Sequence, residues 1–239
     1  LIDVRNLYAM EKVPFFDPPR ATAATPAALP PLATSSGPDA IVRAFHNSAQ
    51  CAQVNANLTG RRDALHAAWA GFEGANSGVW PQHDLARARH LDFTMRTALF
   101  EGHLERGCNA YGACERNIVA LSIRNRALER CFDREGCEAP GDFVGVAATV
   151  SQYNIWDEYL TQISGLTACY LRNDLATQPH YAKLQAMYAQ NVGDVQRILF
   201  GTDGDLLDLF PGASLDDIKK TAHYYHAPAM GKCFPQLER

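Results

Sequence analysis

Residues 114–132, CERNIVALSIRNRALERCF, are the first indication of the architecture of this chain. Six of their side chains recur at steps of four and three, which places them on one face of an α-helix. These six are Cys114, Ile118, Leu121, Asn125, Leu128 and Phe132. Charged residues occupy six of the other 13 positions. The pattern predicts a helix that packs this single face against a core.

Four cysteines flank this helix in two equal spacings, Cys108-x5-Cys114 and Cys131-x5-Cys137. A straight helix keeps its two ends about 25 Å apart over this length, whereas a disulfide needs its Cα atoms within about 7 Å. A bond between Cys114 and Cys131 is therefore excluded. Two arrangements remain, namely the local bridges Cys108–Cys114 and Cys131–Cys137, or bonds to other segments. The cysteines in other segments are Cys51, Cys169 and Cys233.

The number of cysteines also bears on the cellular compartment. The chain has 7 cysteines, so at least one thiol is unpaired or bonds to another chain. Zinc knuckles space their ligands more closely than these pairs, and no histidine lies within either pair. Structural disulfides in an oxidising compartment are the favoured interpretation. The alternative is a set of reduced, buried thiols in a cytosolic protein, because cysteine also packs as a small hydrophobic residue.

Composition excludes several classes of protein. The chain has 239 residues, of which 47% are hydrophobic, and a formal net charge of −4. It can bury a substantial core, and its lack of a basic stripe predicts no nucleic-acid partner. Residues 143–156, the longest apolar stretch, are too few and too polar to span a bilayer. The chain begins at Leu1 without a signal-peptide pattern, and removal of a targeting segment is the simplest expectation.

Residues 1–38 differ from the rest of the chain. Seven prolines lie between Pro14 and Pro38. Proline has no amide hydrogen and favours extended backbone, so this segment is predicted to form an extended Pro/Ala-rich arm. The arm packs either on its own chain or on another protein subunit. Its candidate contact residues are Phe15, Phe16, Pro18 and Pro19.

Residues 39–239 are predicted to form one helical domain. No strand-like alternation of useful length is present, and the expected helices span about 39–58, 61–72, 81–106, 114–131, 142–171, 178–200 and 214–225. Asp39 is the expected N-cap of the first helix. The wide apolar face of residues 142–171 predicts the central helix. The predicted fold class is all-α, an irregular bundle of about seven helices, stapled by disulfides.

Near the C-terminus lies a set of soft metal ligands. These residues are His223, His226, Met230 and Cys233. As a set they are typical of copper or zinc sites. Pro228 and Gly231 interrupt the chain between them, and histidine near a helix C-terminus also favours the helix dipole. The interpretation of these residues as helix-capping and packing groups is the preferred one.

Two further groups resemble parts of known motifs. Asp63 and His66 have the carboxylate-x-x-His spacing of di-iron bundles, but a second copy is missing. His83, Asp84 and His90 share a helix without a recognisable nucleophile motif. We predict no cofactor from these groups.

A fourth group, GTDGDLLD, spans residues 201–208 and resembles a calcium loop only in part. Leu207 and Ser214 occupy ligand positions of that motif, so its aspartates are predicted to form a turn and cap between helices. Ser214 and Asp217 have the spacing of a capping box. The sequon at Asn57 is compatible with a glycan in a secreted protein and carries no further argument.

The sequence favours a non-catalytic accessory or scaffolding subunit of a larger assembly in an oxidising compartment. The favoured setting is a mitochondrial membrane complex, on the intermembrane-space side, with residues 1–38 wrapping a partner. A secreted or periplasmic helical enzyme or ligand-binding protein is the second hypothesis, with Trp156 and Tyr159 lining its pocket. A copper- or zinc-binding protein is the third.

Overall fold

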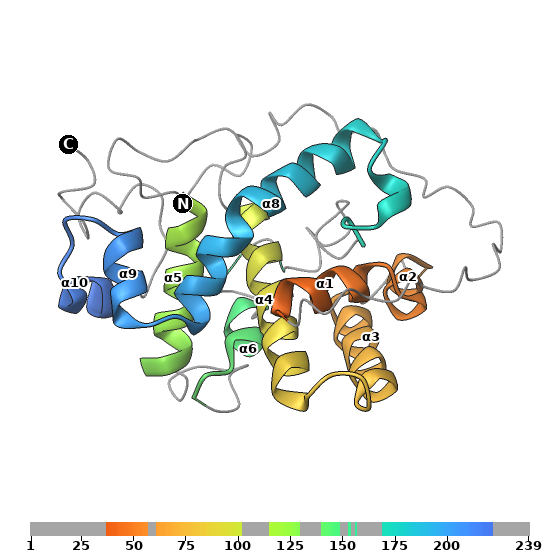
Figure 1. Ribbon diagram of the computed structural model, residues 1–239, viewed down its shortest axis with the longest axis horizontal. Coiled ribbons are helices and arrows are strands. Elements are labelled where there is room, and N and C mark those ends of the chain that lie inside the picture. Colours follow the sequence, from red (N-terminus) through yellow and green to blue (C-terminus); the bar gives the residue numbers. More distant parts are fainter. Residues whose placement is uncertain are drawn as a thin grey trace. The chain divides into compact units, whose positions relative to one another are not determined.

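The computed structural model of the protein describes residues 37–56, 61–101, 115–129, 140–148, 153, 156 and 169–221. Within these ranges the chain is helical and contains no β-strand, which confirms the all-α prediction for this part (Figure 1). The elements are α1 (Pro38–His46), α2 (Ala49–Ala56), α3 (Arg61–Asn76), α4 (Gln82–Glu101), α5 (Glu115–Glu129), α6 (Phe143–Ala147), the 3₁₀ turn η4 (Asn173–Leu175), α8 (Pro179–Phe200), α9 (Asp203–Leu209) and α10 (Leu215–Thr221).

The central element of the described part is α4. It contacts α1, α3, α5, α6 and α8, and every residue from Leu91 to Leu99 is buried. A helix that is covered on all sides has no polar face to show to water. Between Leu91 and Leu99 the polar side chains therefore lie in the interior, and they are Asp92, Thr94, Arg96 and Thr97.

The prediction of a central helix over residues 142–171 is wrong at both of its described ends. Helix α6 ends at Ala147, and residues 169–172 form a turn before η4. Of the side chains with helical spacing, Trp156, Cys169 and Tyr170 lie in the described residues, and all three are buried. Trp156, for example, stacks on Phe93 of α4 with ring centroids 5.6 Å apart. Apolar spacing alone does not distinguish such segments from one continuous helix.

The helix predicted for residues 114–131 is present as α5, but its surroundings differ from the prediction. Leu128 was placed on the core face and is 46% exposed. Asn117, Ser122 and Arg126, which the pattern placed elsewhere, are buried. Because α5 contacts α4, α6, α8 and α10, it is covered on several sides, and one apolar face does not describe it.

The single helix predicted for residues 39–58 is two helices. Gly37 is the N-cap of α1, and Asp39 lies in the first turn, where its carboxylate accepts a hydrogen bond from Arg43. The break falls at Asn47, whose side-chain amide donates to the Arg43 carbonyl oxygen at 2.8 Å. Ser48 precedes the first residue of α2, and its hydroxyl accepts a hydrogen bond from the Cys51 amide in the first turn of that helix. Both residues are of the type that ends or starts helices by bonding the backbone.

Helix α3 is longer than predicted. It continues through Gly71 and Gly74 to Asn76, although glycine inside a helix costs about 1 kcal/mol relative to alanine. Packing compensates for this cost, since the Phe72 ring lies against Trp80, with centroids 5.9 Å apart. Tertiary contacts thus override the local preference.

Several predicted helix ends are confirmed. Pro179 opens α8 after the N-cap Gln178, and Gly201 ends it. Ser214 and Asp217 form the predicted reciprocal cap of α10, with the Asp217 amide 3.1 Å from the Ser214 hydroxyl.

The aspartates of GTDGDLLD also act as predicted. Thr202 and Asp205 form a capping box at the start of α9. Asp205 and Asp208 both pair with Arg197, which lies on α8. The loop is therefore a turn and cap between helices.

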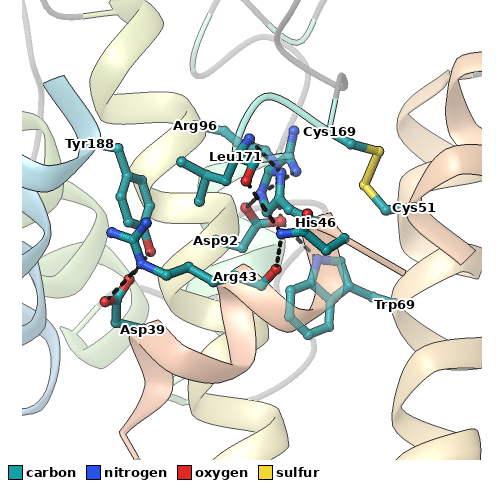
Figure 2. A network of polar contacts seen from close by, with 11 residues as sticks. Asp39, Arg43, His46, Cys51, Trp69, Asp92, Arg96, Cys169, Leu171 and Tyr188 are labelled. Atoms are coloured by element: carbon teal, nitrogen blue, oxygen red, sulfur yellow. Dashed lines mark hydrogen bonds and ion pairs between the residues drawn. A yellow bond between two sulfur atoms is a disulfide. The ribbon is translucent and has the colours of Figure 1, made fainter. Parts of the chain in front are cut away.

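A disulfide joins Cys51 of α2 to Cys169, with Cα atoms 6.0 Å apart and a sequence separation of 118 (Figure 2). In the chain-entropy model a loop of this length stabilises the folded state by roughly 5 kcal/mol. The bond confirms that the fold is disulfide-stapled and joins segments distant in sequence. The remaining predicted cysteines lie outside the described residues, and they are Cys108, Cys114, Cys131, Cys137 and Cys233.

Replacing Asn47 should destabilise the fold more than replacing a similar asparagine elsewhere. Besides its bond to Arg43, Asn47 donates to the Leu171 carbonyl and accepts from the Asn173 amide, whereas Asn76 bonds only within its own helix. We expect Asn47→Ala to lower the free energy of unfolding by about 2 kcal/mol and Asn76→Ala by under about 1. Urea denaturation measures both, and equal losses would contradict the long-range role of Asn47.

Candidate functional site

Polar side chains from three helices meet inside the described part of the chain (Figure 2). Asp92 of α4 accepts hydrogen bonds from His46 Nε2 of α1 at 2.9 Å and from Trp69 Nε1 of α3 at 2.8 Å. Arg96, one turn along α4, donates from Nε to the same carboxylate at 2.9 Å. We call His46, Asp92 and Arg96 the buried ion cluster, since all three side chains are 0% exposed.

The protonation state of His46 follows from its partners. The Leu171 amide donates to His46 Nδ1 at 3.3 Å, so Nδ1 carries no proton. The proton is therefore on Nε2, which donates to Asp92 Oδ1. Arg96 Nη2 lies 3.0 Å from the same Nε2, and because both nitrogens then carry hydrogens this contact is not a hydrogen bond. With a neutral imidazole, the charges of Asp92 and Arg96 cancel within the buried ion cluster.

The pKa values agree with this assignment. Burial lowers the pKa of His46 to about 4, the Arg96 charge acts in the same direction, and Asp92 opposes both. Burial alone would raise the pKa of Asp92, but Arg96 and His46 outweigh it and lower that pKa to about 2. The folded state therefore holds a carboxylate, a guanidinium and a neutral imidazole at neutral pH.

The turn of residues 169–173 covers the buried ion cluster, and we call it the lid. Asn47 donates to the Leu171 carbonyl oxygen at 3.3 Å and accepts from the Asn173 amide at 3.0 Å. Gln185 of α8 donates to the carbonyl oxygens of Tyr170 and Arg172, both at 3.0 Å. The side chains of Asn47, at the end of α1, and of Gln185, on α8, thus provide hydrogen bonds to carbonyl and amide groups of the lid backbone.

Tyr170 is the residue of the lid that packs on the cluster. Its ring centroid lies 5.2 Å from the Arg96 guanidinium carbon and 4.7 Å from the ring centroid of His46. Its hydroxyl is buried and has no hydrogen-bond partner. Burial raises the pKa of Tyr170 well above its usual range, so the phenol is neutral.

Three further side chains, Asp39, Arg43 and Tyr188, continue the contacts toward the surface. Tyr188 of α8 donates from its hydroxyl to Asp39 at 2.9 Å, and the Arg43 guanidinium carbon lies 5.2 Å from the Tyr188 ring centroid. Arg43 Nε also donates to Asp39 at 3.2 Å. Helices α1 and α8 are joined here by the partly exposed Asp39 and Arg43 and by the buried Tyr188.

This arrangement is suited to holding helices together. A His–Asp pair with a free imidazole nitrogen can accept a proton from a substrate. Here the second nitrogen of His46 is bonded to Leu171, and the side chain has no exposed surface. In the folded state described here, the buried ion cluster therefore connects α1, α3, α4 and the lid.

A second group of histidines is only half-buried. His66 of α3 accepts from Arg89 Nη2 at 3.2 Å, and the His90 ring packs edge-on against Phe143. Burial lowers the pKa of each of these histidines to about 4, and the positive charge of Arg89 acts in the same direction. Of the partners suggested by the sequence, Asp63 and His83 point mostly into solvent.

Most site residues predicted from the sequence cannot be compared with this geometry. The following lie outside the described residues: Phe15, Phe16, Pro18, Pro19, His223, His226, Met230 and Cys233. Within the described ranges no three His, Cys, Asp or Glu side chains are placed to hold a metal ion. Trp156, predicted to line a pocket, is buried and donates from Nε1 to Thr97.

None of the helices in the described ranges combines the length and the apolar character that crossing a membrane requires.

No protein-family model, no curated protein and no solved structure matches this chain.

The buried ion cluster was missed by the sequence analysis, although one signal for it exists. Asp92 and Arg96 are spaced i, i+4 within LDFTMRTAL, residues 91–99, where five of the other seven residues are apolar. Charges at such positions are rarely buried unless they are paired. His46 lies 46 residues earlier in the chain, and no local pattern connects it to Asp92.

Removing the charge of Asp92 should be strongly destabilising. Asp92→Asn leaves Arg96 buried without its counter-ion, and we expect a loss of about 3–5 kcal/mol in the free energy of unfolding. Asp208 is a matched control, because its carboxylate also pairs with an arginine, Arg197, at 3.1 Å, but is 75% exposed. Asp208→Asn should cost under about 1 kcal/mol. Urea denaturation measures both variants. Similar losses in the free energy of unfolding would contradict a larger contribution from the buried Asp92–Arg96 pair than from the exposed Asp208–Arg197 pair.

The free energy of unfolding should fall as the pH falls below about 6.5. His46, His66 and His90 have pKa values of about 4 in the folded state, so between pH 6.5 and 4 the unfolded chain binds protons that the folded chain does not. Each such group contributes at most about 1.4 kcal/mol per pH unit, and solvent reduces the value for the half-buried His66 and His90.

Asp92 extends this loss to lower pH. Its pKa is lowered to about 2, so its contribution is present above the unfolded value of 3.8 and is lost as the pH falls toward 2. Urea denaturation as a function of pH measures the total slope. His90→Phe should flatten the slope, whereas the exposed His83→Gln should leave it unchanged. A flat profile between pH about 6.5 and 4 in the wild type would contradict neutral buried histidines.

Proposed function

We propose that this chain is a non-catalytic accessory or scaffolding subunit of a larger protein assembly, in which residues 1–38 wrap around a partner. The observation that carries the proposal is the complete burial of His46, Asp92 and Arg96. These side chains bond to one another and to their neighbouring helices, so their chemistry supports the arrangement of the helices instead of meeting a substrate.

The working compartment in this proposal is an oxidising one. The Cys51–Cys169 disulfide supports it, because such bonds persist where thiols are not kept reduced. Within this class we favour an accessory subunit of a mitochondrial membrane complex, on the intermembrane-space side, over a secreted or periplasmic protein. The partners are other protein subunits, and the proposed contact residues are Phe15, Phe16, Pro18 and Pro19.

Deleting residues 1–38 should release the protein from its assembly without changing its helical content. The reason is that the buried ion cluster, the disulfide and the described helices lie after residue 38, apart from Pro38, the first residue of α1, and its N-cap Gly37. Tagged full-length and truncated chains are expressed in cells of the source organism, extracted gently and compared by gel filtration and far-ultraviolet circular dichroism. The full-length chain should elute in a larger complex, and the truncated chain as a free protein with the same ellipticity per helical residue.

Two matched variants test whether binding depends on the aromatic and proline side chains of the arm or only on the length of the arm. One carries Phe15→Ala, Phe16→Ala, Pro18→Ala and Pro19→Ala, and should also be released. The other replaces residues 21–35 with a Gly/Ser-rich segment of equal length, and should remain bound if the aromatic and proline residues before it make the contact. Retention of the truncated chain in the complex contradicts the role of the arm. A full-length chain that elutes as a monomer favours the helical enzyme or ligand-binding hypothesis.

A further inference from the structure

We infer that the Cys51–Cys169 disulfide is the latch of a redox-dependent lid, residues 169–173, which controls whether solvent reaches the buried ion cluster. The inference does not depend on the arm or on the proposed assembly. It rests on what the lid covers, on how weakly the lid is otherwise attached, and on the position of the disulfide at its first residue.

The lid is the part of the structure that closes over His46. The Leu171 amide occupies His46 Nδ1, and the Tyr170 ring covers both His46 and Arg96. Cys169 and Tyr170 are fully buried, and Leu171 is nearly so. Moving these residues away would expose His46 Nδ1 while leaving its Nε2 bonded to Asp92 on the opposite side of the ring.

The polar attachments of the lid are modest. The bonds that join Leu171 to His46 and to Asn47 are both 3.3 Å long, which is beyond the usual range of 2.7–3.2 Å for such bonds. The bonds from Gln185 to Tyr170 and Arg172 are shorter, at 3.0 Å. Each contributes roughly 1 kcal/mol net, because water replaces it when the lid opens.

Two features of the closed lid favour opening. The Tyr170 hydroxyl is buried without a partner, and water would restore a hydrogen bond to it. The ions of Asp92 and Arg96 also lose their hydration in the closed state. Burial of the apolar parts of Tyr170 and Leu171 opposes both effects. The disulfide ties the first residue of the lid to α2 and tips this balance toward the closed state.

The redox step requires a dithiol reductant. One of its thiolates attacks a sulfur of the disulfide, the S–S bond breaks, and a mixed disulfide forms. The second thiolate then displaces the remaining protein sulfur, so the reductant becomes a disulfide, and Cys51 and Cys169 take up two electrons and two protons in total. Because both cysteines are buried, the reductant reaches them only when the lid opens. The rate of reduction should therefore level off at high dithiol concentration.

The environment of His46 predicts what opening does to it. Asp92 and Arg96 face it from α4, Arg43 acts on it from its own helix, and Tyr170 faces it from the lid. Opening removes Tyr170 and the Leu171 amide and admits water. His46 then becomes an accessible base whose orientation Asp92 still holds.

Chemical modification of histidine tests the inference on the full-length chain. Oxidised protein, protein reduced with dithiothreitol, and the Cys51→Ala/Cys169→Ala variant are treated with diethyl pyrocarbonate, and the modified histidines are quantified by mass spectrometry. His46 should react at least about tenfold faster in the reduced protein and in the variant than in the oxidised protein. His83 is the internal control, because it is mostly exposed and should react equally in all three.

Hydrogen exchange distinguishes a lid from general unfolding. In the reduced protein the amides of residues 169–173 should lose protection, while those of Leu91–Leu99 in the centre of α4 should keep it. Gln185→Ala in the oxidised protein should leave His46 unreactive, because the latch is intact. The inference is overturned if His46 stays unreactive after complete reduction. It is also overturned if α4 loses protection or the double variant does not fold, since the disulfide is then a staple of the whole domain.

Discussion

A single buried carboxylate sets the arrangement of the helices. Asp92 has no exposed surface, and an unpaired ion at such a position would cost several kcal/mol. It is instead bonded by Trp69 from α3, by His46 from α1 and by Arg96 from its own helix. Each donor has to approach from a fixed direction, so α1 and α3 can pack on α4 only at the register that brings them there. The Phe45–Trp69 stack, with centroids 4.0 Å apart, is built around that register.

The same principle recurs along the two helices with the most buried polar residues. On α4, Thr97 accepts a hydrogen bond from the Trp156 indole. On α5, Ser122 bonds to the Tyr153 hydroxyl at 2.7 Å, and Asn125 donates to the Ile218 carbonyl of α10 at 2.6 Å. Thr97, Ser122 and Asn125 thus each satisfy a polar group on another segment. These bonds contribute direction, whereas the surrounding apolar side chains contribute most of the stabilisation.

This dependence explains what could be read from the sequence. Helix ends were predictable where the signal is local, as at Gln178–Pro179 and at Ser214, because caps depend on residues within one turn. The break at Asn47 required knowledge of Leu171, and the pairing of His46 with Asp92 required the folded chain. The apolar-face criterion misplaced Leu128, and it named the wrong central helix, because a helix buried on all sides carries polar residues that bond to neighbours. Periodicity does not report such bonds.

The polar core also explains why the lid depends on a covalent attachment. An apolar core exposed by a small movement loses stability in proportion to the area uncovered. A core containing Asp92 and Arg96 gains hydration when it is uncovered, so its cover is held less by burial alone. Attachment must then come from the cover itself, through the side-chain bonds of Asn47 and Gln185 and through a covalent bond between segments 118 residues apart. The buried ion cluster sets the register of α1 and α3 on α4. We hypothesise that its polarity also makes the stability of the closed lid depend on the redox state of the Cys51–Cys169 disulfide.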